Sequence, residues 1–179
     1  THLTYTVYNG DLPEDEPAPN SHSEEANRLR RRIDQIRGGY DVKDENGNVI
    51  DHRYRFPKML YTRKMVRKNP PNILLTNPTM LEYILLRKKD EKLTNPELKS
   101  LKWIAIDETH TYTGAGAAEL AMLLRRVLLA FGVDATDLHF ATSSATFGNG
   151  ADPAREEDQL RDFISGITGT KKSQVRVIG

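Results

Sequence analysis

The chain of 179 residues has the length of one domain, and its composition excludes several classes of protein. Apolar residues make up 37% of the sequence, which suffices for a folded core and argues against a disordered chain. Because there are no cysteines, neither a disulfide framework nor a thiolate metal site can form. No apolar run reaches the roughly 18 to 20 residues that cross a bilayer, so we expect a cytoplasmic chain without a membrane partner.

The net charge of +1 conceals strong segregation of charge along the chain. Between residues 51 and 72, seven basic residues stand against one carboxylate, whereas residues 11 to 25 are acidic. A nucleic-acid strand responds to such local charge more than to the total. The basic segment includes Arg63 and Lys64 and has aromatic residues interleaved, so it is a candidate phosphate-binding surface. A solvated helix face explains this pattern too, as it explains the arginines between residues 28 and 37.

The first third of the sequence predicts a strand, a helix and a hairpin. Residues 3 to 8 alternate β-branched and aromatic side chains and end at a turn, which indicates a strand. A capped helix is expected from Ser23 to about Arg37, where two glycines would stop it. An Asn-Gly pair then lies between two extended pieces, which is typical of a β-hairpin. We expect residues 40 to 56 to form an exposed insertion.

Strands and helices alternate in the rest of the sequence. Short apolar runs at residues 73–76, 101–106 and 138–142 are typical of buried parallel strands. Helices are expected at residues 79–87 and 117–131, and an acidic amphipathic helix should end near residue 164. A last strand is expected at residues 174–178. This alternation predicts an α/β fold with a parallel sheet.

The apolar run that ends at Ile106 delivers two adjacent carboxylates, Asp107 and Glu108. In open α/β sheets, ligands bind at the carboxyl ends of the strands. A phosphoryl-transfer site needs one carboxylate to hold Mg²⁺, usually through water, and another group to orient or deprotonate the attacking water. Asp107 is the candidate for the first role and Glu108 for the second. Taken alone, such a pair is more often a solvated strand end.

Four motifs resemble, in the same order along the chain, those of the DEAD/DEAH-box helicases of superfamily 2. The box from Asp107 to His110 is similar to motif II, and Ser144-Ala145-Thr146 is similar to motif III. Upstream, Thr76-Asn77-Pro78 stands where motif Ib is expected, and the turn at Gly10 and Asp11 is similar to a glycine-containing turn of the family. The residue sequences of these motifs look most like those of large bacterial and archaeal helicases of the Lhr-like type.

The resemblance implies an enzyme that uses ATP and Mg²⁺ and acts on nucleic acid, with DNA favoured over RNA and movement in the 3′-to-5′ direction. It implies catalytic roles for Asp107, Glu108 and His110. It also implies that Ser144 and Thr146 couple the nucleotide site to nucleic-acid binding, because small hydroxyl side chains can exchange hydrogen-bond partners.

Contacts with nucleic acid are implied for the two upstream motifs. A hydroxyl and an amide at a helix start, here Thr76 and Asn77, can bind a backbone phosphate together with the helix amides. The same three residues are also an ordinary helix cap. Gly10 and Asp11 are implied as further contacts. The basic residues Arg63 and Lys64 lie close in sequence to Thr76, which favours contact with nucleic acid for them too.

The implied fold is a three-layer RecA-like (P-loop NTPase) parallel sheet flanked by helices, with residues 1–179 forming an incomplete first motor domain. The sequence contains no Gly-x-x-x-x-Gly-Lys-Ser/Thr loop to cradle phosphates and nothing similar to the arginine-containing motif VI. We therefore expect the phosphate-loop strand to precede Thr1 and a second RecA-like domain to follow Gly179. The 179 residues alone should then lack ATPase activity.

Two alternatives remain. His110 with its neighbouring carboxylates, and His139 on the next strand, suggest a metal-dependent hydrolase, although no second histidine stands at a recognisable ligand spacing. A non-catalytic nucleic-acid-binding or scaffolding domain derived from the helicase fold is the second alternative. The retention of both Asp107 and Glu108 argues against it.

Overall fold

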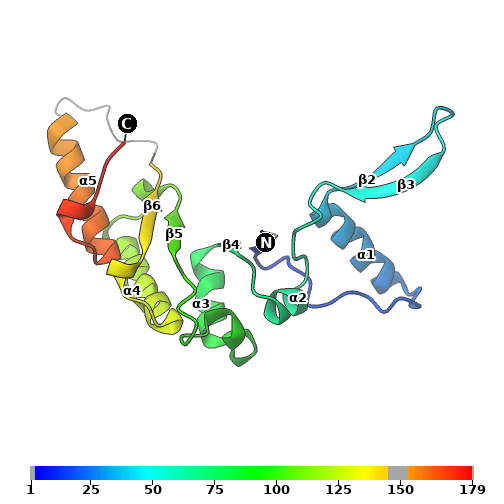
Figure 1. Cartoon of the computed structure of the whole chain (residues 1–179), viewed down its shortest axis with the longest axis horizontal. Coiled ribbons are helices and arrows are strands. Elements are labelled where there is room, and N and C mark those ends of the chain that lie inside the picture. The colour runs from blue at the N-terminus through cyan, green and yellow to red at the C-terminus, as the bar shows by residue number, and fades with distance from the viewer. Residues whose placement is uncertain (1–2, 145–152, 179) are drawn as a thin grey trace. The chain divides into compact units, whose positions relative to one another are not determined.

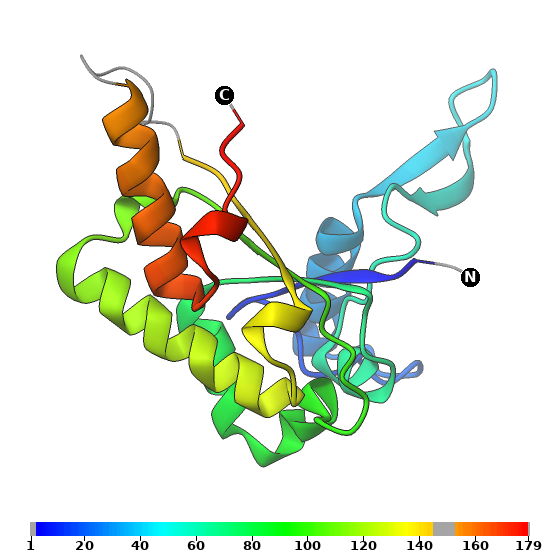
Figure 2. The ribbon, with the colours of Figure 1, turned by 60° about the vertical axis from the view of Figure 1, so that its left-hand side comes forward.

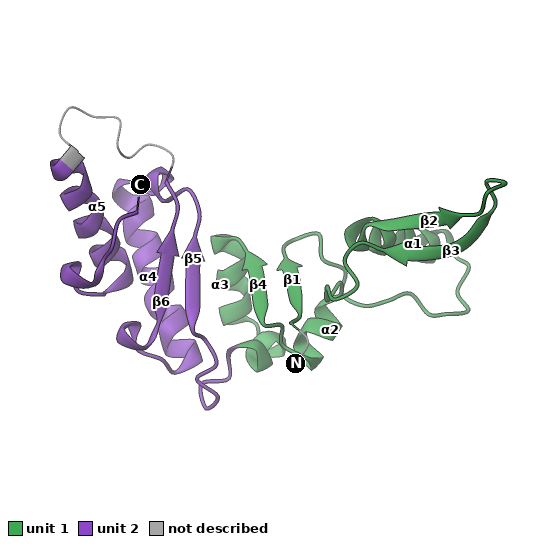
Figure 3. Cartoon of the chain, turned by 45° about the horizontal axis from the view of Figure 1, so that its top comes forward, with its two compact units in different colours: residues 1–93 green, residues 94–179 purple. Residues whose placement is uncertain are grey.

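The computed structural model describes residues 3–144 and 153–178, and the chain forms two compact units, residues 1–93 and 94–179 (Figure 3). Each unit contains one pair of parallel strands with helices packed against it, and the first unit also contains a β-hairpin (Figure 1). The predicted α/β class is therefore confirmed. Among the described residues, no helix combines the length and apolarity needed to cross a membrane.

The first unit is built on strands β1 (Tyr5–Tyr8) and β4 (Ile73–Thr76), which are parallel and in register along their full lengths. Helices α2 (Arg63–Lys68) and α3 (Pro78–Leu86) pack against one face of this pair, and the 3-10 helix η1 (Lys88–Thr94) follows α3. The buried apolar side chains that join these elements are Tyr8, Leu12, Val66, Met80, Ile84 and Leu93.

Helix α1 (Glu24–Arg37) begins and ends where its sequence predicts. The Ser23 hydroxyl accepts a hydrogen bond from the Ala26 amide at 3.1 Å, which satisfies one of the free amides of the first turn. Gly38 ends the helix in the left-handed conformation with φ of 63°, which glycine adopts without a Cβ penalty. The capping signals in the sequence therefore define this helix at both ends.

The expected hairpin is formed by the antiparallel strands β2 (Gly39–Lys43) and β3 (Val49–Tyr54). Its turn contains Gly47 with φ of 83°, a left-handed conformation that favours glycine. The hairpin prediction is confirmed, and the description of residues 40–56 as an insertion stays a prediction.

His52 ties the hairpin to α1. From β3, its Nδ1 lies 2.7 Å from Asp41 Oδ1 on β2, and its Nε2 lies 2.7 Å from Asp34 Oδ1 on α1. The hydrogen bonds with Asp41 and with Asp34 raise the pKa of His52. An imidazolium donates from both nitrogens at once, whereas a neutral ring donates from only one. Protonated His52 therefore satisfies both carboxylates.

Asp90 is the buried polar centre of the first unit, with a side chain that is 0% exposed. Its Oδ1 accepts hydrogen bonds from the Tyr8 hydroxyl at 3.0 Å and from Arg67 Nε at 2.6 Å. Arg67 also pairs with Glu14 in the loop after β1. Although burial disfavours the charged form, Glu14 and Asp90 hold the pKa of the Arg67 guanidinium above its usual value. A charged pair therefore lies inside this unit.

The second unit is built on the parallel strands β5 (Trp103–Ile106) and β6 (His139–Thr142). Helices α4 (Gly114–Phe131) and α5 (Pro153–Thr168) pack together against one face of the pair (Figure 2). Short 3-10 helices lie at η2 (Thr109–Thr111) and η3 (Ala135–Asp137). The predicted apolar stripe of α4 is confirmed by its buried residues, which include Leu120, Ala121, Leu124 and Val127.

The prediction of a strand at residues 174–178 is wrong. The 3-10 helix η4 (Lys172–Gln174) occupies the start of this segment, and residues 175–178 are irregular. The Val175 amide closes a turn onto the Lys172 carbonyl, so it is not available for a strand ladder. The Lys172 ammonium is held by two carboxylates of α5 at 2.9 and 2.7 Å. These contacts outweigh the β-branched residues that suggested a strand.

The expectation of fully buried parallel strands is also wrong. On β4, Ile73 is 45% exposed and Leu75 is 51% exposed, and on β5 Trp103 is 63% exposed. In the described part of the chain, β4 and β6 have no fully buried residue, because the core clusters form on one face of each parallel pair. The three-layer arrangement, with helices on both faces of one sheet, stays a prediction.

We expect Asp90→Ala to destabilise the first unit by about 3–5 kcal/mol, because it leaves the largely buried Arg67 guanidinium without this partner. Urea denaturation of the wild type and the variant measures the difference. Lys64→Ala is the matched control, since the Lys64 pair with Asp15 is solvent-exposed and should contribute nothing measurable. Equal effects of the two substitutions would contradict the buried-pair interpretation.

We expect the contact between the hairpin and α1 to weaken as the pH rises. The pKa of His52 is higher in the folded state, so its contribution is complete below the unfolded pKa of about 6.5 and is lost as pH rises through the folded pKa. Hydrogen exchange of the hairpin amides, corrected for intrinsic rates, should show this loss of protection. His52→Gln should abolish the pH dependence. Protection that is independent of pH in the wild type would rule out this clamp.

Candidate functional site

The box from Asp107 to His110 follows β5 directly, so it lies at the carboxyl end of a parallel strand as predicted. The Asp107 and Glu108 side chains are exposed, whereas Thr109 is fully buried. Glu108 adopts the left-handed conformation, with φ of 51° and ψ of 45°. This conformation costs a residue with a Cβ about 1–2 kcal/mol, so other contacts must hold the turn.

Ser143, the residue that follows β6, makes those contacts. Its hydroxyl donates a hydrogen bond to Asp107 Oδ1 and accepts one from the Glu108 amide at 3.2 Å. Its carbonyl oxygen accepts from the Thr109 amide at 2.9 Å and from the Thr109 hydroxyl at 2.7 Å. The Ser143 amide donates to the Ile106 carbonyl at 3.0 Å. One residue therefore fixes both the carboxylate of Asp107 and the backbone of the turn.

The donor set at Asp107 fits a hard cation. Ser143 bonds to Oδ1, and none of the hydrogen bonds in the described part of the chain uses Oδ2. Mg²⁺ prefers carboxylate oxygens and binds through one or two of them while retaining water and contacting phosphates. The exposed Asp107 carboxylate is therefore suited to hold Mg²⁺ directly or through water.

His110 and Ser144 do not show the relay that motif III implies. His110 Nδ1 lies 3.2 Å from Glu108 Oε2 but lacks hydrogen-bond geometry. The Ser144 hydroxyl is buried and has no hydrogen-bond partner among residues 3–144 and 153–178. Thr146 lies outside the described residues. A coupling role for Ser144 and Thr146 stays a prediction, and the contact seen between the end of β6 and motif II runs through Ser143.

Motif spacing does not single out Ser143, yet the strand pattern contains a signal for it. In the parallel pair, Ile106 lies opposite Thr142, so β5 and β6 end in register. The residues that follow them, Asp107 and Ser143, are therefore adjacent. A polar residue directly after each of two neighbouring parallel strands is the pattern that indicates such a contact.

Thr76 and Asn77 have local structural roles in the first unit. The Thr76 hydroxyl donates to the Tyr8 carbonyl at 2.8 Å. The Asn77 side-chain oxygen accepts from the Met80 amide at 2.8 Å and caps the start of α3. The helix-cap interpretation is therefore confirmed for Asn77, and contact of either residue with nucleic acid stays a prediction.

The acidic loop after β1 pairs with the basic segment that contains α2. The Lys64 ammonium lies 2.5 Å from Asp15 Oδ2, and Arg63 donates to the Asn9 carbonyl at 3.2 Å. The hydrogen bond from Lys64 lowers the pKa of Asp15. Much of the positive charge expected to face phosphate is therefore compensated within the chain, although the Lys64 side chain remains 70% exposed.

The turn at Gly10 and Asp11 follows β1, as predicted. The Asp11 amide donates to the side chain of Asn9 at 3.0 Å, and Asp11 Oδ1 accepts from the Arg32 guanidinium of α1 at 2.9 Å. The turn is therefore linked to α1 through an ion pair that the sequence did not reveal.

Comparison with known proteins identifies relatives of the chain, although no family model matches it. Lhr-Core, an ATP-dependent helicase of Methanocaldococcus jannaschii, is 31% identical over 151 residues, which are 78% of this chain. The Druantia protein DruE of Escherichia coli is 30% identical over 126 residues, or 66% of this chain. The uncharacterized ATP-dependent helicase YprA of Bacillus subtilis is 36% identical over 87 residues, or 49% of this chain.

The chain belongs to the helicase superfamily. The predicted resemblance to helicases is thereby confirmed, and the assignment of the individual motifs stays a prediction. The chain spans only 7% of the length of DruE, 16% of Lhr-Core and 11% of YprA. Among solved structures, the DUF1998 helicase MrfA is 26% identical, with a TM-score of 0.39 over 89% of this chain and 22% of that one.

We expect Ser143→Ala to loosen the turn from Asp107 to His110 locally. It removes the hydroxyl contacts with Asp107 and the Glu108 amide but leaves the carbonyl contact with Thr109. One neutral hydrogen bond contributes about 0.5–1.5 kcal/mol, so exchange of the Glu108 amide should accelerate roughly two- to tenfold. Amide exchange measured by NMR provides the test, with the Thr109 amide as an internal control.

Ser144→Ala is the matched variant for this measurement, because its hydroxyl has no hydrogen-bond partner in the described part of the chain. We expect it to leave the Glu108 amide unchanged. If Ser144→Ala accelerates exchange and Ser143→Ala does not, the assignment of the turn to Ser143 is wrong.

Proposed function

We propose that this chain forms part of an ATP-dependent helicase or translocase, within a three-layer RecA-like domain that carries motifs Ib, II and III. The observation that carries the proposal is the pair Asp107 and Glu108 at the carboxyl end of β5, held by Ser143 from the neighbouring strand. Curated relatives named as ATP-dependent helicases support it.

In this proposal, Asp107 holds Mg²⁺ through water and Glu108 orients or deprotonates the water that attacks the terminal phosphate of ATP. Bound Mg²⁺ supplies charge stabilisation to the phosphates. The hydrogen bond from Ser143 restricts the rotation of the Asp107 carboxylate. His110 Nδ1 lies 3.2 Å from Glu108 Oε2, so the histidine stands beside this carboxylate. The Asp107 carboxylate is therefore oriented before ATP binds, which lowers the reorganisation required in the reaction.

The nucleic acid, with DNA favoured over RNA, is proposed to contact the first unit. Its candidate ligands are Thr76, Asn77, Gly10, Arg63 and Lys64, and Asp11 contributes by holding Arg32. Ser144 and Thr146 are proposed to transmit the nucleotide state. The proposal includes a phosphate loop and a second RecA-like domain supplied outside these 179 residues, since no phosphate-loop motif occurs among them.

Glu108→Gln in the full-length protein is expected to reduce ATP turnover about 100-fold or more, because the amide cannot accept the proton of the attacking water. ATP binding should remain within a few-fold of the wild type, since the residue is not proposed to hold phosphate. Steady-state ATPase assays and equilibrium nucleotide binding measure the two effects.

Glu119→Gln is the matched control, because Glu119 is an exposed glutamate on α4. It should leave turnover unchanged. Unaltered turnover in Glu108→Gln would exclude the role proposed for Glu108. A full-length protein that binds nucleic acid but shows no Mg²⁺-dependent turnover would instead support the non-catalytic alternative.

A further inference from the structure

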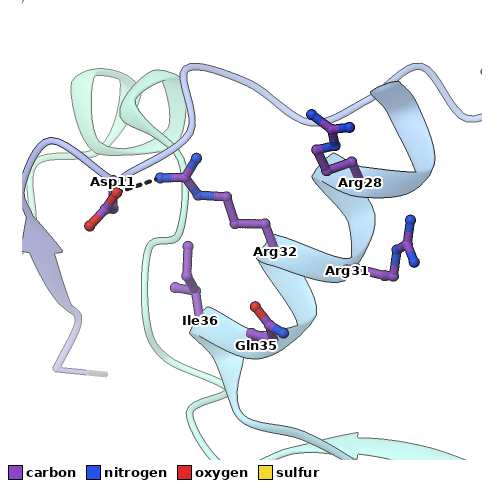
Figure 4. Close-up of a pocket in the computed structure, with 6 residues that line it drawn as sticks. All are labelled: Asp11, Arg28, Arg31, Arg32, Gln35 and Ile36. Atoms are coloured by element: carbon purple, nitrogen blue, oxygen red, sulfur yellow. Dashed lines mark hydrogen bonds and ion pairs between the residues drawn. The ribbon is translucent and has the colours of Figure 1, made fainter. Parts of the chain in front are cut away.

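Helix α1 presents three arginines on one exposed face. Arg28, Arg31 and Arg32 have the spacing i, i+3 and i+4, which places them on neighbouring positions of the same helical surface. Together with Asp11, Gln35 and Ile36 they line an open hollow of about 580 Å³ (Figure 4). We call Arg28, Arg31 and Arg32 the α1 face.

Few contacts within the chain compensate the positive charge of the α1 face. Arg28 lies 3.8 Å from Glu24, and both side chains are highly exposed, at 79% and 88%. For Arg31, the hydrogen bond seen in the described part of the chain is a long one, from Nε to the Asn27 carbonyl at 3.4 Å. Exposed ion pairs of this kind contribute little to stability. The guanidinium groups of Arg28 and Arg31 are therefore available to another anion.

Arg32 is the best-held member of the α1 face. It reaches from α1 to Asp11, with Arg28 one turn closer to the helix start (Figure 4). The Asp11 side chain is 84% exposed, so a phosphate can approach Arg32 from solvent beside it. A guanidinium presents five N–H groups and can bind a carboxylate and a phosphate oxygen together. Asp11 therefore orients Arg32.

The other arginines of α1 are different. Arg30 donates to the carbonyls of Ala18 and Pro19 at 3.0 and 3.3 Å, which ties the preceding loop to the helix. The Arg37 guanidinium lies 3.4 Å from the Tyr54 ring centroid and 4.5 Å from that of Tyr61. These two arginines have structural partners. The contrast separates the α1 face from a helix that is merely rich in arginine.

We propose that the α1 face binds the phosphate backbone of a nucleic-acid strand. The inference rests on the proposed function, which makes nucleic acid the partner of the first unit. An open hollow lined by guanidinium groups suits an extended polyanion better than an enclosed small molecule. The ion pair between Arg32 and Asp11 places the α1 face beside the turn at Gly10 and Asp11. The α1 face is therefore continuous with this proposed nucleic-acid contact within the first unit.

The test uses the full-length protein with Arg28 and Arg31 replaced together by glutamine. Arg32 is retained, because its loss would also release Asp11. Binding of a fluorescently labelled oligo-dT strand is measured by anisotropy at several salt concentrations. Each lost phosphate contact lowers the slope of log affinity against log salt by roughly 0.7 for a single strand. We expect a slope reduction of about 1.4, with thermal unfolding unchanged.

Two further variants sharpen the result. Arg28→Lys with Arg31→Lys retains the charge but loses the forked donor geometry, so it should keep the salt slope and bind more weakly. Arg125→Gln with Arg176→Gln removes the same charge from two exposed arginines of the second unit. We expect this control to bind like the wild type. A uniform effect of net charge would instead lower the slope of log affinity against log salt in both glutamine variants.

The outcomes separate this inference from the proposed function. If the wild type binds the strand and the Arg28/Arg31 glutamine variant keeps the full slope, the α1 face is not a binding surface while the proposed function stands. If both glutamine variants lose the same slope, the effect is one of net charge and the α1 face is again excluded. If the wild type binds neither oligo-dT nor the corresponding RNA strand, the proposed function and this inference are both overturned.

Discussion

The contact of Ser143 with the turn after β5 is the constraint on which the candidate nucleotide site depends. Two carboxylates in sequence do not make a site unless their directions are fixed. The left-handed conformation of Glu108 turns the chain abruptly after the strand, and that conformation is unfavourable by itself. Ser143 offsets the cost with its hydroxyl and its carbonyl oxygen, and both come from the end of the adjacent strand. The geometry of the site is therefore a property of strand pairing.

A comparable constraint organises the first unit. Asp90 joins the Tyr8 hydroxyl on β1 to Arg67 on α2, and Arg67 continues to Glu14 in the acidic loop. A buried ion pair contributes less net stability than its charges suggest, because both groups lose solvation. It does exclude other arrangements, since any packing that separates Asp90 from Arg67 leaves a charge buried alone. The chain before α2 is thereby held to the helix.

The sequence predicts most elements because their signals are local. Ser23 and Gly38 define α1, the glycine turn defines the hairpin, and the apolar stripe defines α4. The errors occur where the outcome depends on distant residues. The segment at 174–178 has the composition of a strand, but Lys172 just before it is held by Asp158 and Asp162 of α5. A continuous apolar run such as residues 73–76 also does not reveal whether one or both faces are covered, because both faces are apolar.

The same limit applies to the candidate site. Motif order predicts Asp107 and Glu108 as site residues and identifies the helicase family, because both depend on residue identity and spacing. Ser143, which holds the Asp107 carboxylate and the Glu108 amide, becomes evident only from the register of two strands separated by more than thirty positions. Whether a basic side chain is available to bind phosphate also depends on partners that are distant in the sequence.

By charge alone, Lys64 and Arg28 are both candidate phosphate-binding residues, since each belongs to a segment rich in basic residues. The structure separates them by their partners. Lys64 lies 2.5 Å from the Asp15 carboxylate, whereas Arg28 lies 3.8 Å from Glu24. A cation already in contact with a carboxylate must lose that contact, or share it, before it binds phosphate, and this offsets part of the gain. The segment with the higher density of positive charge is therefore not necessarily the stronger phosphate-binding surface.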